Sequence, residues 1–195
     1  MSRRIRVGVI GAGAWATVTH LPAIAADPDV ELVVVNRRSV ATARAIADRF
    51  GAAHATGDWQ EAIAMGLDAV VIASPPNVHR EQVLAAIASG AHVLCEKPFA
   101  IRAQDAWTMA GAARSAGRHL LVAFGWNYMP LMTSARTLMR EQRIGEIEYV
   151  NIAINVAVRE LLTRGIPYNS ATGGIAPQAE TFVEPAISGG GTAPV

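Results

Sequence analysis

Residues 5–16 read IRVGVIGAGAWA, an apolar run followed at once by a glycine-rich turn. The run is rich in valine and isoleucine, so it predicts a buried strand over residues 5–10. The spacing G-x-G-x-x-A that follows is typical of a tight turn that opens a helix. This turn consists of Gly11, Ala12, Gly13, Ala14, Trp15 and Ala16.

The turn has the residue types that the pyrophosphate of a dinucleotide requires. Gly11 permits the sharp turn, Gly13 lets the phosphates approach the backbone, and Ala16 keeps the helix close to the sheet. The free N–H groups and the positive dipole end of the helix would then bind the anion. Because a strand precedes the turn and a helix follows it, the motif predicts a dinucleotide site. The alternative is a glycine-rich turn that binds no ligand.

From the first strand to about residue 126, short β-branched runs alternate with longer alanine-rich segments of helical spacing. This rhythm predicts an α/β fold, a doubly wound parallel sheet with crossover helices. The apolar runs are continuous, which favours strands buried on both faces. The predicted strands are residues 5–10, 30–35, 69–73, 92–95 and 120–124, with a weaker one at 53–55. The predicted helices are residues 42–50, 58–64, 79–88 and 104–116, each followed by a glycine at the position of a left-handed cap.

The second predicted strand ends in Asn36-Arg37-Arg38-Ser39, where NAD-binding domains carry an acidic residue on the ribose. No carboxylate is present there to repel the 2′-phosphate of NADP. Two guanidinium groups could hold that phosphate by charge-assisted hydrogen bonds. We therefore expect NADP(H) to be favoured over NAD(H). The alternative is that the arginines are solvated charges at a helix start.

Two further segments follow predicted strands at the carboxyl edge of the sheet, where doubly wound folds bind ligands. The first is Ser74-Pro75-Pro76-Asn77-Val78-His79, a loop stiffened by its prolines. Asn77 in this loop has two interpretations, since it could cap the next helix or bind a ribose hydroxyl.

The second segment is Glu96-Lys97-Pro98. Lys97 is the candidate catalytic residue, because an ammonium beside a nicotinamide can stabilise charge that develops on a substrate oxygen. Glu96 could orient this lysine. The alternative is a surface charge at a strand end.

Together, the glycine turn, His20, the Ser74 to His79 segment and Glu96-Lys97-Pro98 resemble the Gfo/Idh/MocA family of oxidoreductases. The resemblance implies an NAD(P)-binding Rossmann domain over residues 1–126. It implies that residues 127–195 begin a substrate and oligomerisation domain, an α+β open sheet. It also implies hydride transfer between nicotinamide and a hydroxyl or ketone of a sugar, cyclitol or related polyol, in a homo-oligomer, a dimer or tetramer.

The resemblance also assigns residues. Lys97 corresponds to the family's active-site lysine. The positions that line the family's cofactor cleft are Ser74, Pro75, Asn77, His79 and Glu96. Asn127 is carried over from Trp126-Asn127-Tyr128-Met129-Pro130, where the arginine of the family's pattern is absent. His20 stays open between a structural and a functional role, because the sequence shows no acid–base partner beside it.

The pattern changes after Pro130. A helical stretch containing Arg136 and Arg140 ends at Gly145, and residues 147–158 predict one long strand. The family's Asp-x-x-x-His pair would begin just after residues 189–191, but the sequence stops at Val195. We therefore expect an incomplete second domain, and a chain that binds cofactor without turning over substrate.

Composition limits the other functions. With 51% hydrophobic residues, 17% charged residues and a net charge of +1, the chain reads as a soluble globular protein. The near-neutral balance argues against nucleic acid and against a membrane surface, and no apolar run is long enough to span a bilayer. The single cysteine, Cys95, suits the reducing cytoplasm, and no metal site is expected.

Two classes of function therefore compete. The first is an NAD(P)-dependent oxidoreductase that acts on CH–OH groups. The second is a non-catalytic dinucleotide-binding or redox-sensing module. Glu96-Lys97-Pro98 favours the first, since a sensor needs no lysine at the site of hydride transfer.

Overall fold

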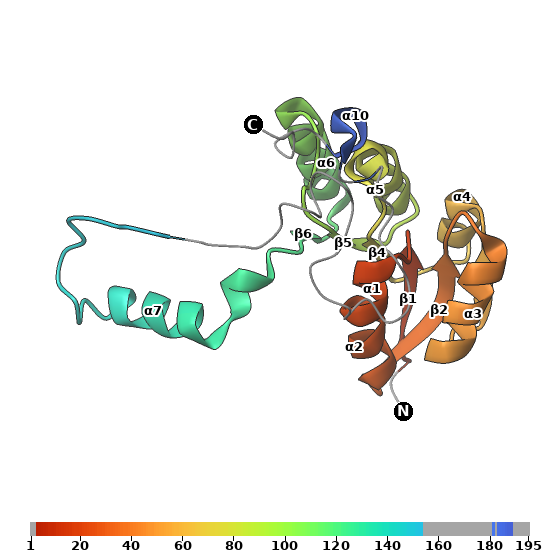
Figure 1. The fold of residues 1–195 in the computed structure, drawn as a ribbon, viewed down its shortest axis with the longest axis horizontal. Helices are drawn as coiled ribbons and strands as arrows, with labels where there is room; N and C mark the ends of the chain where they lie inside the picture. The colour runs from red at the N-terminus through yellow and green to blue at the C-terminus, as the bar shows by residue number, and fades with distance from the viewer. Residues whose placement is uncertain (1–2, 154–180, 182, 189–195) are drawn as a thin grey trace.

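The computed structural model describes residues 3–153, 181 and 183–188. Six parallel strands form one sheet in the order β3-β2-β1-β4-β5-β6 (Figure 1). They are β1 (Ile5–Ile10), β2 (Val30–Asn36), β3 (His54–Thr56), β4 (Ala69–Ile72), β5 (His92–Cys95) and β6 (Leu120–Val122). The predicted parallel α/β sheet is confirmed; β1 and β5 have the expected bounds, and the ends of the other strands differ by at most two residues.

The strand order reverses between β1 and β4. From β1 the chain adds β2 and β3 on one side, and it then crosses to add β4, β5 and β6 on the other. The connections leaving the carboxyl ends of β1 and β4 therefore lead away from each other. Such a reversal opens a crevice at the carboxyl edge of the sheet, between these two strands.

Helices cover both faces of the sheet. They are α1 (Ala14–Val18), α2 (His20–Ala26), α3 (Val40–Phe50), α4 (Trp59–Ile63), the 3₁₀ turn η1 (Pro76–Val78), α5 (His79–Ala88) and α6 (Ala103–Ala116). The glycines after α3, α4, α5 and α6 all have positive φ, as expected for left-handed caps. A fresh helix starts after Thr19 because Pro22 falls in the first turn of α2, where a missing N–H costs no helical bond.

Two apolar clusters, one on each face, explain why the strands are continuous apolar runs. Ile10, Ile72 and Met109 are fully buried in the cluster beneath α4, α5 and α6. Val9 and Leu21 are fully buried in the cluster beneath α1, α2 and α3. Each large apolar side chain buried in this way contributes about 1.5–3 kcal/mol. Both faces of the sheet therefore hold the crevice in place.

The chain after the sheet forms an arm that stands away from it (Figure 1). The arm contains the 3₁₀ turn η2 (Gly125–Tyr128) and α7 (Pro130–Arg140), so the expected helix after Pro130 is present but ends at Arg140 rather than at Gly145. The strand predicted over residues 147–158 is wrong for its described part, because residues 147–153 have no regular secondary structure. A strand needs a neighbour for its N–H and C=O groups, and none lies beside this segment among the described residues. Residues 154–158 lie outside the described residues.

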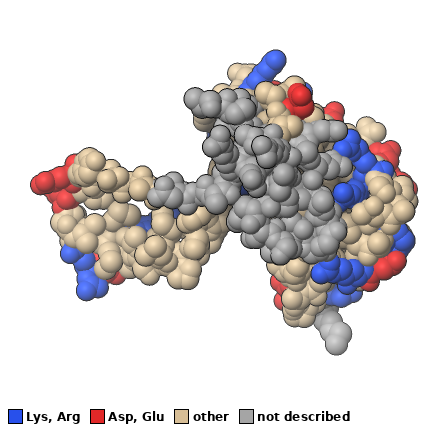
Figure 2. Space-filling view, viewed as in Figure 1, with Lys and Arg blue, Asp and Glu red and all other residues tan. Residues whose placement is uncertain are grey.

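A short helix, α10 (Pro185–Ser188), lies back against the sheet domain beside η1 (Figure 1). Within the described ranges, no helix is long and apolar enough to cross a membrane. In the part of the sheet domain that is uncovered in Figure 2, basic and acidic side chains are interspersed.

Candidate cofactor and active site

The glycine turn brings β1 and β4 into close backbone contact. Gly11 has a φ of +75°, and a Cβ added there would lie 2.4 Å from the backbone nitrogen of Ser74. Only glycine fits this position, for reasons of both conformation and space. A Cβ on Gly13 would meet nothing closer than the Gly11 carbonyl oxygen at 3.7 Å. The protein itself therefore leaves room above Gly13, as the approach of a phosphate requires.

A cavity of about 380 Å³ opens over this turn at the reversal of strand order. Eleven predicted cofactor residues line it: Gly11, Gly13, Ala14, Trp15, Ala16, Asn36, Arg37, Arg38, Ser74, Pro75 and Asn77. The lining residues that sequence reasoning missed are Gly57, Trp59, Ala73, Val78, Gln82, Thr181 and Ile187. Four predicted site residues lie outside the lining: His79, Glu96, Lys97 and Asn127.

At the end of β2, Asn36 lines the cavity and also links neighbouring segments by hydrogen bonds. Its side chain is buried, donates to the carbonyl of Thr56 at 3.1 Å and accepts from the N–H of Gly11 at 3.4 Å. It thus joins β3 to the glycine turn. Because the side chain is buried and already bonded at both its oxygen and its nitrogen, recognition of a ribose at this end falls mainly to its neighbours.

The two arginines after Asn36 differ in their surroundings. Arg37 is half-buried, and its Nη1 donates to the Ala12 carbonyl at 3.0 Å. Burial lowers the pKa of Arg37, and the charge of Arg38 lowers it further. Arg38 is exposed, and the next residue, Ser39, caps α3 by accepting from the N–H of Thr42 at 3.3 Å. Both guanidinium groups lie at the cavity, where an anion would offset their mutual repulsion.

The loop after β4 forms a wall of the cavity. The Ser74 hydroxyl donates to Oε1 of Gln82 at 2.5 Å, which ties the loop to α5. Asn77 lies within η1 and caps neither helix, since Pro75 is the N-cap of η1 and Val78 that of α5. The capping interpretation of Asn77 is therefore wrong. The residue is exposed at the cavity, as ligand contact requires.

His79 lies behind this wall and not in the cavity. Its side chain is fully buried, with Nε2 2.7 Å from the Ser74 carbonyl and Nδ1 3.2 Å from the Phe99 carbonyl. Burial holds the pKa of His79 below its ordinary value, although both carbonyls favour the protonated form. The histidine braces the loop after β4 against the loop after β5.

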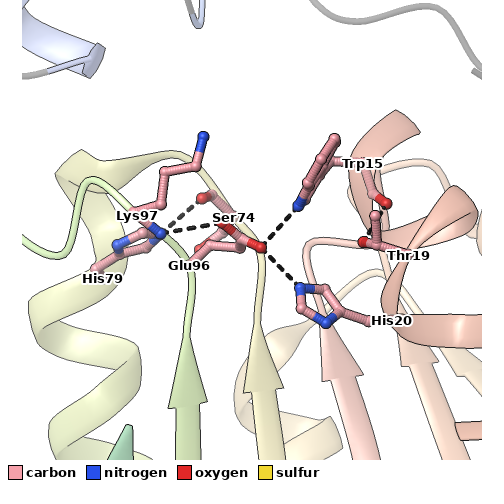
Figure 3. Close-up of polar contacts among 7 residues, drawn as sticks. All are labelled: Trp15, Thr19, His20, Ser74, His79, Glu96 and Lys97. Carbon is pink, nitrogen blue, oxygen red and sulfur yellow. Dashed lines mark hydrogen bonds and ion pairs between the residues drawn. The ribbon is translucent and has the colours of Figure 1, made fainter. Parts of the chain in front are cut away.

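Glu96 is buried at the end of β5 and accepts three hydrogen bonds (Figure 3). Oε1 accepts from the Trp15 Nε1 at 2.8 Å and lies 2.7 Å from Nε2 of His20, while Oε2 accepts from the Lys97 N–H at 3.0 Å. Burial tends to raise the pKa of Glu96, but the bonds from His20, the Lys97 N–H and Trp15 outweigh it and leave the pKa below its usual value. The carboxylate is therefore ionised, and the His20 Nε2 must carry a proton to donate.

This contact corrects the sequence interpretation of His20. The sequence showed no partner beside His20, yet Glu96 lies against it from 76 residues further along the chain. The order of the predicted elements could have indicated this pairing. His20 opens α2, the second helix after the glycine turn, and Glu96 directly follows β5, so both lie near the same edge of the parallel sheet.

Lys97 is exposed at the open side of this cluster. Its Nζ lies 5.7 Å from the centroid of the Trp15 ring, within range of a cation–π interaction. In Figure 3 the ammonium points away from the strand ends, as does the indole. The Lys97 side chain therefore lies just beyond a residue that lines the cavity.

The last predicted site residue, Asn127, lies in η2, and the lining of the cavity does not include it. Instead, Thr181 and Ile187 reach the cavity from the segment around α10. No group of three or more potential metal ligands occurs in the part of the chain that the structure describes.

The sheet, its reversal and the glycine turn define a dinucleotide-binding domain of the Rossmann type. Residues 5–124 match the family described as "Oxidoreductase family, NAD-binding Rossmann fold". The chain belongs to this family, Gfo/Idh/MocA, as its motifs indicated.

Relatives agree with this assignment. The chain is 39% identical over 127 residues to scyllo-inositol 2-dehydrogenase (NADP(+)) IolU of Bacillus subtilis, covering 65% of this chain and 38% of that protein. It is 34% identical over 167 residues to D-glucoside 3-dehydrogenase of Escherichia coli, covering 85% and 46%. The solved structure of KijD10, a 3-ketoreductase from Actinomadura kijaniata in complex with NADP and TDP-benzene, shares 31% identity and a TM-score of 0.68, covering 74% and 45%. The chain thus spans less than half the length of each of these proteins.

Proposed function

We propose that this chain is the cofactor-binding part of an NAD(P)-dependent oxidoreductase. The reaction is hydride transfer between nicotinamide and a hydroxyl or ketone of a sugar, cyclitol or related polyol. The observation that carries the proposal is the cavity at the reversal of strand order, with arginines in its lining and the Lys97 ammonium just beyond Trp15. The names of the relatives, an inositol dehydrogenase, a glucoside dehydrogenase and a ketoreductase, support the substrate class.

The residues present fit a dinucleotide. The room above Gly13 suits a pyrophosphate, and the first residues of α1 line the same cavity. Asn77 is exposed beside it and could bind a ribose hydroxyl. The bound cofactor would supply a hydride donor or acceptor at the nicotinamide, beside Trp15 and Lys97.

The composition of the chain supports a chemical role for Lys97. It is the only lysine among the 17 lysine and arginine residues of the sequence. Arginine stays protonated in proteins, whereas the lysine ammonium is a compact charge that can give up a proton. We therefore assign to Lys97 the hydrogen bond to the reacting oxygen of the substrate, where it would share a proton as charge develops. This role favours the oxidoreductase over the non-catalytic sensing module.

NADP(H) is the proposed cofactor, with NAD(H) as the alternative. Arg37 and Arg38 line the cavity at the end of β2, where no carboxylate opposes a 2′-phosphate. The names of IolU and of the KijD10 complex include NADP, which agrees with this preference.

Residues 127–195 are proposed to begin the substrate domain, in a protein that assembles as a homo-oligomer. The support is α7, whose side chains Leu131, Met132, Leu138 and Met139 are exposed in the arm. Their spacing places them along one face of the helix, and such a face is normally buried against another element.

Binding of the two reduced cofactors tests the proposal. Energy transfer from tryptophan to reduced nicotinamide would report binding of NADPH and NADH to the chain, and we expect NADPH to bind more tightly. Binding of neither cofactor would contradict the proposal. For the reaction, transfer of deuterium from [4-²H]NADPH to a keto-inositol or keto-sugar by the protein with its substrate domain distinguishes the oxidoreductase from the sensing module.

A further inference from the structure

The Glu96 carboxylate joins two parts of the site that the sheet keeps apart. Trp15 and His20 come from the helices after β1, and Glu96 comes from the end of β5. Strand β4 lies between β1 and β5. The Glu96 side chain therefore reaches past the carboxyl end of β4, across the reversal of strand order, to contact both residues (Figure 3).

The partners of this carboxylate are complementary to a buried negative charge. Glu96 is 7% exposed, and a carboxylate buried to this degree is stable only when donors surround it. Oε1 has two side-chain donors, Trp15 Nε1 and His20 Nε2, at 2.8 and 2.7 Å. Oε2 has the backbone N–H of Lys97 at 3.0 Å. One carboxylate thus holds both an indole of the cofactor turn and the backbone of the candidate catalytic lysine.

Trp15 has an unusual combination of exposure and restraint. The residue is 56% exposed in the cavity lining, yet the bond to Glu96 fixes the direction of the indole N–H. The orientation of the ring is fixed with it. The Lys97 Nζ lies 5.7 Å from the centroid of that ring. Since the ammonium is attracted to the ring face, a fixed ring restricts where a flexible lysine chain places its charge.

We propose that His20 and Trp15 are positioning residues for Lys97: His20 acts through Glu96, and Trp15, held by Glu96, acts on the Lys97 ammonium directly. His20 holds the carboxylate in place. Trp15 is held by it and offers its ring to the ammonium, while the carboxylate fixes the Lys97 backbone. This inference rests on the proposed function, because Lys97 matters as the residue beside the substrate oxygen. The competing view is that His20 only fastens α2 to the sheet and leaves Lys97 unaffected.

The single lysine makes this proposal directly measurable without turnover. Reductive methylation with ¹³C-formaldehyde labels Lys97 and the N-terminal amine and leaves the arginines unmodified, and it keeps the lysine charge. The Lys97 signal in a ¹H–¹³C spectrum is identified by its loss in Lys97→Arg. Its shift reports the position of the ammonium relative to the Trp15 ring, because methyl groups over a ring face are shielded.

We expect Trp15→Leu to move the Lys97 signal downfield. His20→Ala should move it in the same direction or broaden it, while His20→Gln, which can still donate to Glu96, restores the parent position. The matched controls are Trp107→Leu, at an exposed tryptophan on α6, and His54→Ala, at an exposed histidine of β3. Neither control should shift the signal.

An unchanged Lys97 signal in folded Trp15→Leu and His20→Ala would overturn the proposal, even if both variants lose thermal stability. If circular dichroism shows His20→Ala to be unfolded, His20→Leu takes its place, because leucine fills more of the space of the imidazole and cannot donate to Glu96. An unshifted Lys97 signal in that variant overturns the proposal in the same way. NADPH added to the parent tests the proposed function separately. A cofactor that binds without shifting the Lys97 signal would contradict the assignment of Lys97 to the nicotinamide, whatever the variants show.

Discussion

Nη1 of Arg37 donates a hydrogen bond to the carbonyl oxygen of Ala12 at 3.0 Å, which fixes a guanidinium from the end of β2 to the glycine turn. The remaining N–H groups of that guanidinium are thereby oriented, and less freedom is lost when they bind an anion. The lowered pKa of Arg37, caused first by burial and then by the charge of Arg38, indicates that an anion at this place would be stabilising.

Replacement of Arg37 should therefore weaken the binding of NADPH more than the binding of NADH. A hydrogen bond to a charged group contributes about 1.5–3 kcal/mol, so Arg37→Ala should reduce NADPH affinity by about 10- to 100-fold. NADH lacks the 2′-phosphate, so its affinity should fall by a smaller factor. Titrations of both cofactors at fixed ionic strength measure the difference. Arg44→Ala, on the exposed side of α3 where Arg44 pairs with Asp48, should change neither affinity. Equal losses for the two cofactors would instead indicate a disturbed glycine turn.

Two glycines with similar φ should respond differently to alanine. Gly66 has a φ of +69° with nothing within 4 Å of an added Cβ, whereas the Gly11 Cβ would strike the Ser74 backbone. Gly66→Ala should lower the free energy of unfolding only by the strain of a left-handed alanine, about 1–2 kcal/mol. Gly11→Ala adds an overpacking cost of about 1–3 kcal/mol and should abolish cofactor binding. Urea unfolding measures both, and equal costs would argue against the clash.

The stability of the chain should fall with acidification partly through His79. Its folded-state pKa is depressed by burial, so its contribution is fully present above the ordinary histidine value of about 6.5. That contribution is lost as the pH falls toward the depressed value, with a slope of at most about 1.4 kcal/mol per pH unit for one proton. The free energy of unfolding between pH 7.5 and 5 should therefore fall less steeply in His79→Leu than in the parent.

His79→Leu should also be less stable at neutral pH, because it leaves the Ser74 carbonyl without its partner, a loss of about 1–3 kcal/mol. His54→Leu replaces an exposed histidine and should keep the slope of the parent. An identical slope in the parent and in His79→Leu would show that His79 does not carry this pH dependence.

Cys95 should report the opening of the sheet. Its side chain is fully buried, and burial, with a further contribution from the charge of Glu96, raises the pKa of its thiol to about 12. Only the thiolate reacts with a disulfide reagent, so at pH 8 the folded chain should react far more slowly than the chain in urea. The chain has one cysteine, and a single labelling rate therefore follows opening. Rapid labelling of the folded chain would contradict the burial.

Much of the Rossmann domain could be predicted from sequence, because a strand buried on both faces must be apolar throughout. The buried centres of β1, β2 and β4 are apolar in this way, and each strand lies where its run of valine and isoleucine indicated. The strand predicted at 147–158 lacks this support. Its residues suit a strand, but a strand also requires a neighbour, which residues 147–153 do not have among the described residues.

Side-chain contacts at the site were harder to predict than its position in the fold. The motifs indicated which residues lie at the carboxyl edge of the sheet, and they could not indicate which side of a loop each one faces. His79 and Asn77 belong to one segment, yet His79 lies behind the cavity wall and Asn77 lies on it. The pairing of His20 with Glu96 depends on the order of the strands, and no local pattern contains that order.

The hydrogen bonds from Glu96 to Trp15 and His20 also require a side chain of a particular length at position 96. The gap between the glycine turn and the end of β5 is spanned by one side chain, and a glutamate has two methylene groups with which to span it. An aspartate would fall short by one carbon–carbon bond, while a glutamine would keep the reach and lose the charge. The length of the Glu96 side chain thus sets the distance between the turn that would bind the phosphates and the lysine that would contact the substrate.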